Sequence, residues 1–250
     1  MTQRKYYAVL AGDIIKSSRL SPRQLESVRS LLIRTVDTAS GWKRGLVKGK
    51  PEFFRGDAWQ LLLTDPSMAM RVAILIRATL LARGLADSRV AIGLGEVEHI
   101  FSKRVSLSTG QAFILAGGAL DDMTRYSSMT VEIPASAGPL SEWLSVAAHL
   151  CDSLIGQWTG RQAEMVRAAI DPSEPDYERI GRSLKPAISK QAAAKGLSGA
   201  NWHAIREAIR LFEGTSWKAV LQPGYPDNQK RLSYSRQPKK VVPAQTTKKG

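Results

Sequence analysis

The sequence predicts an α+β protein in which an antiparallel sheet is followed by a wholly helical region. Over the first half of the chain, strand-like apolar runs and amphipathic segments follow the order strand, helix, strand, strand, helix, strand. From about residue 139 every periodic segment is helical. The predicted organisation is a mixed domain at 1–135, a helical domain at 139–213 and a disordered basic tail at 214–250.

The mixed domain begins with a nearly continuous apolar run at residues 5–15, as expected for a strand buried on both faces. Ser21 and Pro22 then mark the start of a helix that ends near residue 39. Two extended runs within 51–64 flank a Gly bend, which predicts a hairpin. The remaining elements are a helix at 66–83, a strand at 88–100, a short helix at 110–123 and a strand at 130–134. This order predicts a ferredoxin-like sheet with helices on one face.

The formal net charge of +14 is unevenly distributed. Residues 1–150 carry 19 Lys and Arg against 13 Asp and Glu, and residues 151–213 carry 9 against 8. Residues 214–250 carry 8 against 1, so half of the excess lies in the predicted tail. A basic tail serves an anionic partner such as nucleic acid, or it is a solubilising segment without a partner.

Several features predict a cytoplasmic protein. Cys151 is the single cysteine, which excludes an intramolecular disulfide, fits a reducing compartment and predicts a packing role for its thiol. The longest apolar segment, 70–86, is interrupted by Arg77 and Arg83 and is not expected to span a membrane. The first residues indicate an early strand rather than a signal peptide.

Two Gly-Asp pairs interrupt apolar runs, one ending in Asp13 and one ending in Asp57. In the predicted sheet the first strand lies beside the hairpin, so the two carboxylates meet at one edge. Carboxylates in a poorly solvated site repel each other, and Mg²⁺ or Mn²⁺ relieves this repulsion while accepting water and phosphate oxygens. The predicted metal ligands are therefore Asp13 and Asp57. The alternative is that each pair is only a turn at a strand end.

The segment after Asp13 offers backbone N–H groups, a lysine and two hydroxyls, which suit a triphosphate. Glycine before each aspartate allows a ligand to approach the backbone. Asp121 and Asp122 indicate a solvated helix end, with a metal role as the alternative. The predicted nucleotide-binding residues are Gly12, Ile14, Lys16, Ser17, Ser18 and Gly56.

Three motifs together resemble the SatD family: GDIIKSS at 12–18, GDAWQ at 56–60 and RVAIGLGEVEHI at 89–100. More distantly, residues 5–135 are similar to the catalytic palm of class III nucleotidyl cyclases and of GGDEF domains. The resemblance implies a two-metal site for phosphoryl transfer in which Asp13 and Asp57 bind the ions.

The chain departs from the cyclase pattern at several positions. The resemblance implies a helix of pattern G-P-A-V-N-L-A-x-R, whose Asn and Arg stabilise the transition state, but Ile114 and Gly118 stand there. SatD-like chains keep an Arg one position earlier, where this chain has Gly117, and Phe53 replaces the base-selecting Lys. Losing such a cation costs several orders of magnitude in rate, so the resemblance implies a binding site with weakened catalysis.

Residues 178–196 indicate a helix-turn-helix, with helices at 176–184 and 186–196, and SatD-like proteins are also expected to carry one. In such a motif the second helix enters the DNA major groove. The alternative is an ordinary packing unit of two short helices. The predicted DNA-binding residues are Arg182, Lys185, Ser189, Lys190, Gln191 and Lys195.

These patterns predict a DNA-binding regulator of the bacterial type whose cyclase-like domain senses a nucleotide or metal and catalyses only weakly. Two other classes stay open. One is an active Mg²⁺-dependent nucleotidyl cyclase or oligonucleotide synthase recruited to nucleic acid. The other is an RNA- or protein-binding scaffold with structural aspartates. A homodimer is expected by analogy, since palms and helix-turn-helix proteins often pair.

Overall fold

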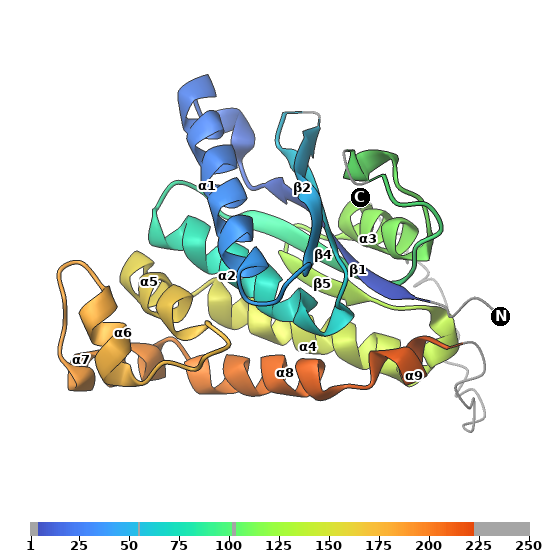
Figure 1. Cartoon of the computed structure of the whole chain (residues 1–250). Coiled ribbons are helices and arrows are strands. Elements are labelled where there is room, and N and C mark those ends of the chain that lie inside the picture. Colours follow the sequence, from blue (N-terminus) through green and yellow to red (C-terminus); the bar gives the residue numbers. More distant parts are fainter. Residues whose placement is uncertain (1–4, 55, 102–103, 223–250) are drawn as a thin grey trace, which may run out of the picture.

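The computed structural model of the chain describes residues 5–54, 56–101 and 104–222. Within these residues five strands form one sheet, in the order β2-β3-β1-β4-β5. The strands are β1 (Tyr6–Ile14), β2 (Val47–Phe54), β3 (Ala58–Leu63), β4 (Ser88–Glu96) and β5 (Met129–Glu132). All pairs are antiparallel except β4 with β5. Helices pack on this sheet, which confirms the predicted α+β class (Figure 1).

The central strand β1 contributes side chains to two separate cores, which explains its continuous apolar sequence. Leu10 and Ile14 enter the larger core, and Val9 and Ala11 enter a smaller one on the opposite face of the sheet. This alternation follows from the two-residue period of a strand. Because both faces are covered, β1 has no solvent-facing stripe of polar residues.

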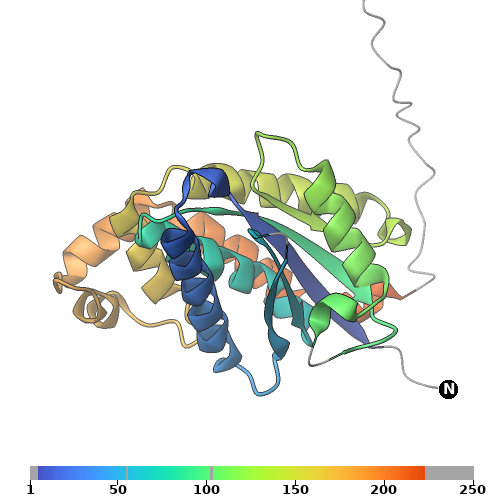
Figure 2. The same cartoon turned by 90° about the horizontal axis from the view of Figure 1, so that it is seen from above.

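Helices cover both faces of the sheet, which corrects the prediction of helices on one face only. Helices α1 (Pro22–Ser40) and α2 (Ala69–Ala82) lie on one face, and α3 (Gln111–Asp122) lies on the other (Figure 2). Gly93 and Gly95 make this possible: a Cβ on Gly93 would lie only 2.5 Å from the backbone nitrogen of Ala116. The missing side chains let α3 pack directly on β4.

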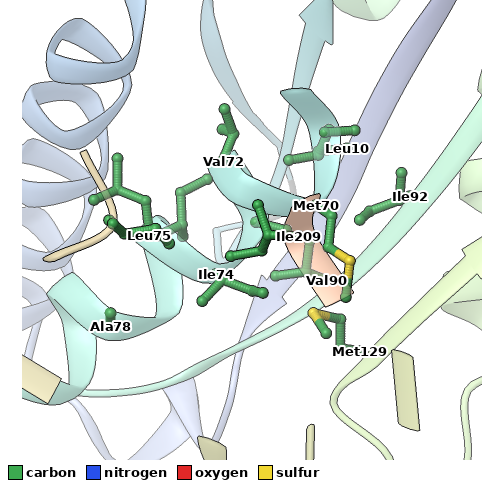
Figure 3. Close-up of a cluster of buried hydrophobic side chains, with 14 of the residues drawn as sticks. Leu10, Met70, Val72, Ile74, Leu75, Ala78, Val90, Ile92, Met129 and Ile209 are labelled. Atoms are coloured by element: carbon green, nitrogen blue, oxygen red, sulfur yellow. The ribbon is translucent and has the colours of Figure 1, made fainter. Parts of the chain in front are cut away.

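The second half of the chain is helical and packs against the first half. Its helices are α4 (Pro139–Ile155), α5 (Gly160–Ala169), α6 (Tyr177–Ser183), α7 (Lys190–Gly199), α8 (Trp202–Gly214) and α9 (Trp217–Leu221). One core cluster contains residues of the sheet and of these helices. Figure 3 shows Ile209 of α8 beside Met70 and Ile74 of α2 and Val90 of β4.

Among the boundaries that differ from the prediction, two lie at the predicted helix-turn-helix and at the predicted tail. The second helix of the predicted helix-turn-helix begins at Lys190, not Pro186, because the side chain of Ser189 accepts a hydrogen bond from the Ala192 N–H and caps the helix. Residues 217–221, predicted to lie in the disordered tail, form α9, whose Trp217, Val220 and Leu221 are buried. Residues 223–250 lie outside the described residues.

Two arginines of α2 join the sheet region to the helical region. Arg71 is bonded to both carboxylate oxygens of Glu213 in α8, at 2.5 and 2.8 Å. Arg77 is bonded to Asp87, just before β4, and to Asp152 in α4. Neither α2 nor any other helix in the described ranges is long and apolar enough to cross a membrane.

Candidate functional site

The sheet brings the two predicted aspartates to one edge. Asp13, near the end of β1, pairs in register with Ala58, the residue that follows Asp57. The backbone N–H of Ile14 donates to the carbonyl of Asp57 at 3.3 Å, which joins the end of β1 to the hairpin. Since Ile14 uses its N–H in this bond and buries its side chain, it has no backbone donor left for a phosphate.

Asp13 forms a bidentate ion pair with Arg89, its register partner on β4. Nε of Arg89 donates to one carboxylate oxygen at 2.9 Å, and Nη2 donates to the other. Arg89 also reaches the carbonyl of Met123, the C-cap of α3, at 3.4 Å. The sequence motifs did not single out Arg89, because a cross-strand partner 76 positions away leaves no local pattern.

The charges around Arg89 extend beyond Asp13. The hydrogen bonds to Asp13 raise the pKa of Arg89, while partial burial opposes the increase. The charges of Asp13, Asp121 and Asp57 raise this pKa further. We refer to Asp13, Asp57 and Asp121 with Arg89 as the strand-end cluster. A cation of the chain itself thus lies among the carboxylates predicted to bind a metal.

A buried hydrogen-bond chain holds the backbone of Asp13. Nε1 of Trp59, which is fully buried, donates to Oγ of Ser88 at 2.9 Å, and that hydroxyl donates to the carbonyl of Asp13 at 2.7 Å. Gly12 makes room for this packing, since a Cβ there would lie 2.5 Å from the Trp59 ring. The absence of a side chain at Gly12 is therefore explained by Trp59 and not by a ligand.

The loop after Asp13 is partly committed to internal contacts. The hydroxyl of Ser17 donates to the carboxylate of Asp57, and the Ile15 N–H donates to the carbonyl of Asp87 at 2.9 Å. Lys16 has a left-handed backbone (φ 57°), and its side chain and that of Ser18 are exposed. These two exposed side chains are the part of the predicted phosphate loop that faces solvent.

The backbone conformation of the hairpin bend explains why position 56 is glycine. Its φ of +92° lies in the region that favours glycine, and its carbonyl accepts a hydrogen bond from Nε of Arg29 at 3.1 Å. The guanidinium of Arg29 also lies 5.7 Å from the centre of the Phe53 ring. Arg55 in the same bend lies outside the described residues.

The donor set of the strand-end cluster does not fit a metal ion as the side chains stand. Mg²⁺ is usually bound through one or two carboxylates with free oxygens. Both oxygens of Asp13 accept from Arg89, and Asp57 accepts from Ser17. Within the described ranges there is also no group of three or more His, Cys, Asp or Glu arranged to hold a metal ion.

The α3 positions that the resemblance assigns to catalysis carry no polar side chain. Ile114 is 76% exposed, and no atom lies within 4 Å of a Cβ added to Gly117 or Gly118. Ile114 and Gly118 line a cleft of about 660 Å³ between α3, β5 and α4. Cys151 of α4 is buried, and burial together with the charge of Asp152 raises the pKa of its thiol to about 11, which favours the protonated thiol at neutral pH.

The second candidate site is the pair α6 and α7, at the end of the molecule away from α3 and α9 (Figure 1). Ala193 and Leu197 bury one side of α7, and a Cβ on Gly181 of α6 would collide with the carbonyl of Ile188 in the turn. Arg161 of α5 braces the same turn through a 2.7 Å bond to the carbonyl of Pro186. The six predicted DNA-binding residues are all exposed: Arg182, Lys185, Ser189, Lys190, Gln191 and Lys195.

The charge of this region is segregated along the chain, a signal that the total over 151–213 conceals. The loop and first turn at 171–178 hold four acidic residues. From Arg179 to Arg206 there are six Lys and Arg and no Asp or Glu. Arg182 pairs with Glu178, whereas no ion pair joins Lys185, Lys190 or Lys195 to another described residue.

Comparison with known proteins assigns no family to the chain. No protein-family model matches it. No curated protein matches it either. Among solved structures it is similar to the crystal structure of the guanylyl cyclase Cya2, at 16% sequence identity and a TM-score of 0.37, over 52% of this chain and 76% of that chain. A likeness at this level does not define the function of the chain, and membership of the SatD family stays a prediction.

Proposed function

We propose that the chain binds double-stranded DNA through α6 and α7, with α7 as the helix that enters the major groove. The observation that carries this proposal is the run from Arg179 to Arg206, which has six cationic residues and no acidic one. A surface that releases counterions from phosphates needs cations that the protein has not already neutralised. Lys185, Lys190 and Lys195 meet this requirement because all three are exposed.

The geometry of α7 supports the same proposal. Its N-terminus carries Lys190 and Gln191 on the exposed side, whereas Ala193 and Leu197 fix the opposite side to the protein. In helix-turn-helix proteins the N-terminal residues of the second helix reach base edges. Lysine contacts phosphates as a point charge, and glutamine pairs with both N6 and N7 of adenine.

In this proposal the sheet region is a ferredoxin-like, palm-type domain that acts as a sensor and is not an efficient enzyme. Two observations support this part: Arg89 takes both oxygens of Asp13, and α3 has no polar side chain at 114, 117 or 118. Binding of a nucleotide with Mg²⁺ or Mn²⁺ at Asp13 and Asp57 stays a prediction, as does a homodimer.

Salt-dependent binding of the full chain to a random-sequence duplex tests the DNA-binding proposal. Lys190→Ala is expected to weaken binding on every sequence and to reduce the slope of log K against log salt by about 1, because one phosphate contact is lost. Lys50→Ala is the matched control, since it removes an equally exposed lysine from β2. Equal effects of the two substitutions, or none from Lys190→Ala, would refute binding through α7.

A turnover assay distinguishes a sheet region that only senses a nucleotide from one that is an active enzyme. The full chain is incubated with each nucleoside triphosphate and Mg²⁺ or Mn²⁺, and cyclic and oligomeric products are separated by chromatography. We expect no product above the level of Asp13→Asn. Product formation that Asp13→Asn abolishes would replace the sensor with an active nucleotidyl cyclase or oligonucleotide synthase.

A further inference from the structure

Arg89 is bonded to the carboxylate of Asp13 and to the carbonyl of Met123, and the charges of Asp121 and Asp57 also act on it. Asp13 lies across the strand pair, Asp121 lies in the last turn of α3, and Asp57 lies at the hairpin. The carbonyl of Met123 adds an acceptor from the C-terminus of α3. Carboxylate and carbonyl oxygens are the ligand types that hard divalent cations select, and here a guanidinium is bonded to them instead.

The pair between Arg89 and Asp13 is favoured by its geometry. A guanidinium offers two parallel N–H groups that match the two oxygens of a carboxylate, and Arg89 uses both. The side chains are 33% and 21% exposed, so water screens the pair only in part. A cation beside the last carbonyls of α3 also interacts favourably with the helix dipole.

The backbone holds the two partners in place before any side chain moves. Asp13 and Arg89 are direct register partners on adjacent antiparallel strands. Ser88, the neighbour of Arg89, fixes the carbonyl of Asp13 and is itself held by Trp59. Little ordering of flexible chain is therefore needed to form the pair, unlike an ion pair between two loops.

We propose that Arg89 is the resident cation of the strand-end cluster, so that a divalent ion reaches Asp13 only by displacing the guanidinium. Arg89, and not the number of carboxylates, then sets the affinity of this edge of the sheet for metal. The proposal is independent of DNA binding by α7, and it is tested without DNA or nucleotide.

The test measures binding of Mn²⁺ alone to the full chain by electron paramagnetic resonance, which counts free ions. We expect Arg89→Gln to bind Mn²⁺ at least about tenfold more tightly than the wild type, because the ion no longer competes with a bidentate ion pair. Adding Asp13→Asn to Arg89→Gln is expected to remove the gain. Arg83→Gln is the matched control: it removes the same charge from an exposed position at the end of α2 and is expected to change nothing.

Three results would overturn the proposal. The first is that the wild type binds Mn²⁺ as tightly as Arg89→Gln, through a site that Asp13→Asn destroys. The second is that Arg89→Gln gains no affinity for Mn²⁺. The third is that Arg83→Gln gains as much affinity as Arg89→Gln, which would make the effect one of net charge. If circular dichroism shows that Arg89→Gln does not fold, Arg89→Lys decides: it keeps the charge and loses the fork, so Mn²⁺ affinity must rise above wild type for the proposal to stand.

Discussion

The sheet region and the α6–α7 pair both carry cations, but three buried or half-buried arginines of the first are paired in a way that the exposed lysines of the second are not. In the sheet region Arg71, Arg77 and Arg89 are each bonded to a carboxylate through two nitrogen–oxygen contacts or more. On α7, Lys190 and Lys195 project into solvent. These three arginines are held by the fold, whereas Lys190 and Lys195 are the cations that the proposed DNA binding would use. Pairing, and not the count of charged residues, separates a structural ion from one available for recognition.

Removing Arg77 should give the largest loss of stability. Its side chain is 1% exposed and is bonded to Asp87 at 2.7 and 3.0 Å and to Asp152 at 2.6 Å. Arg77→Met would leave two carboxylates without their cation, which costs about 3–5 kcal/mol of the free energy of unfolding. Urea unfolding of the full chain measures the change. Arg83→Met, at an exposed position, is expected to change it by less than about 0.5 kcal/mol; equal effects would mean that Arg77 is not a buried structural ion.

A glycine of the sheet region and a glycine of α7 differ in what an added Cβ would meet. A Cβ on Gly93 would meet backbone atoms of α3, whereas a Cβ on Gly196 of α7 would meet only the side-chain end of Met165. Gly93→Ala is therefore expected to cost about 1–3 kcal/mol by overpacking. Gly196→Ala should cost clearly less, because methionine has three rotatable bonds and can move aside. Thermal unfolding of both variants checks the order, and a larger cost at Gly196 would contradict this view of the two regions.

Local signals in the sequence predicted much of the fold. Ser21 and Pro22 were expected to start a helix, and Ser21 forms a capping box with Gln24 there. The hairpin and β1 also lie where the apolar runs predict them. Two N-terminal signals compete before α7, a proline at 186 and a serine at 189, and the chain begins the helix after the serine. The role of Gly93 and Gly95 cannot be read from the strand alone, because it depends on the position of α3.

The candidate site was less predictable, because its decisive contacts join distant residues. Asp13 and Asp57 were expected to share an edge, and the register places them there. Arg89 is 76 positions from Asp13, and the 89–100 motif that it begins assigns its side chain no role, so nothing local indicated that a cation of the chain would take the carboxylate. The charge of α6–α7 was concealed by summing over an acidic loop and a basic helix pair.

Ala192→Glu should disrupt the proposed DNA-binding surface without harming the fold. Ala192 is the third residue of α7, after the N-cap Ser189, so glutamate there completes a capping box. The free energy of unfolding is expected to stay constant or to rise by about 0.5 kcal/mol. The new negative charge lies between Lys190 and Lys195, so DNA affinity should fall at least about tenfold. Fluorescence anisotropy with a labelled duplex measures the affinity.

Ala219→Glu is the matched control for this charge. It places glutamate at the third position of α9, also three residues after a serine, on an exposed site outside α6 and α7. Its DNA affinity should equal that of the wild type within the salt series. A comparable loss in both variants would mean that DNA responds to the net charge of the chain and not to α7.

Gly118→Ala should give a small gain in stability. Gly118 lies inside α3, is exposed, and has no atom within 4 Å of an added Cβ. Alanine there should stabilise the helix by about 0.5–1 kcal/mol, because it removes the backbone entropy of glycine without creating a contact. Gly84→Ala is the informative contrast: its surroundings are equally open, but its φ of +61° strains an alanine, so stability should fall. Thermal unfolding measures both changes, and DNA affinity should be unaffected by either. A loss of stability in Gly118→Ala would contradict this expectation and would show that α3 needs the open space at this position.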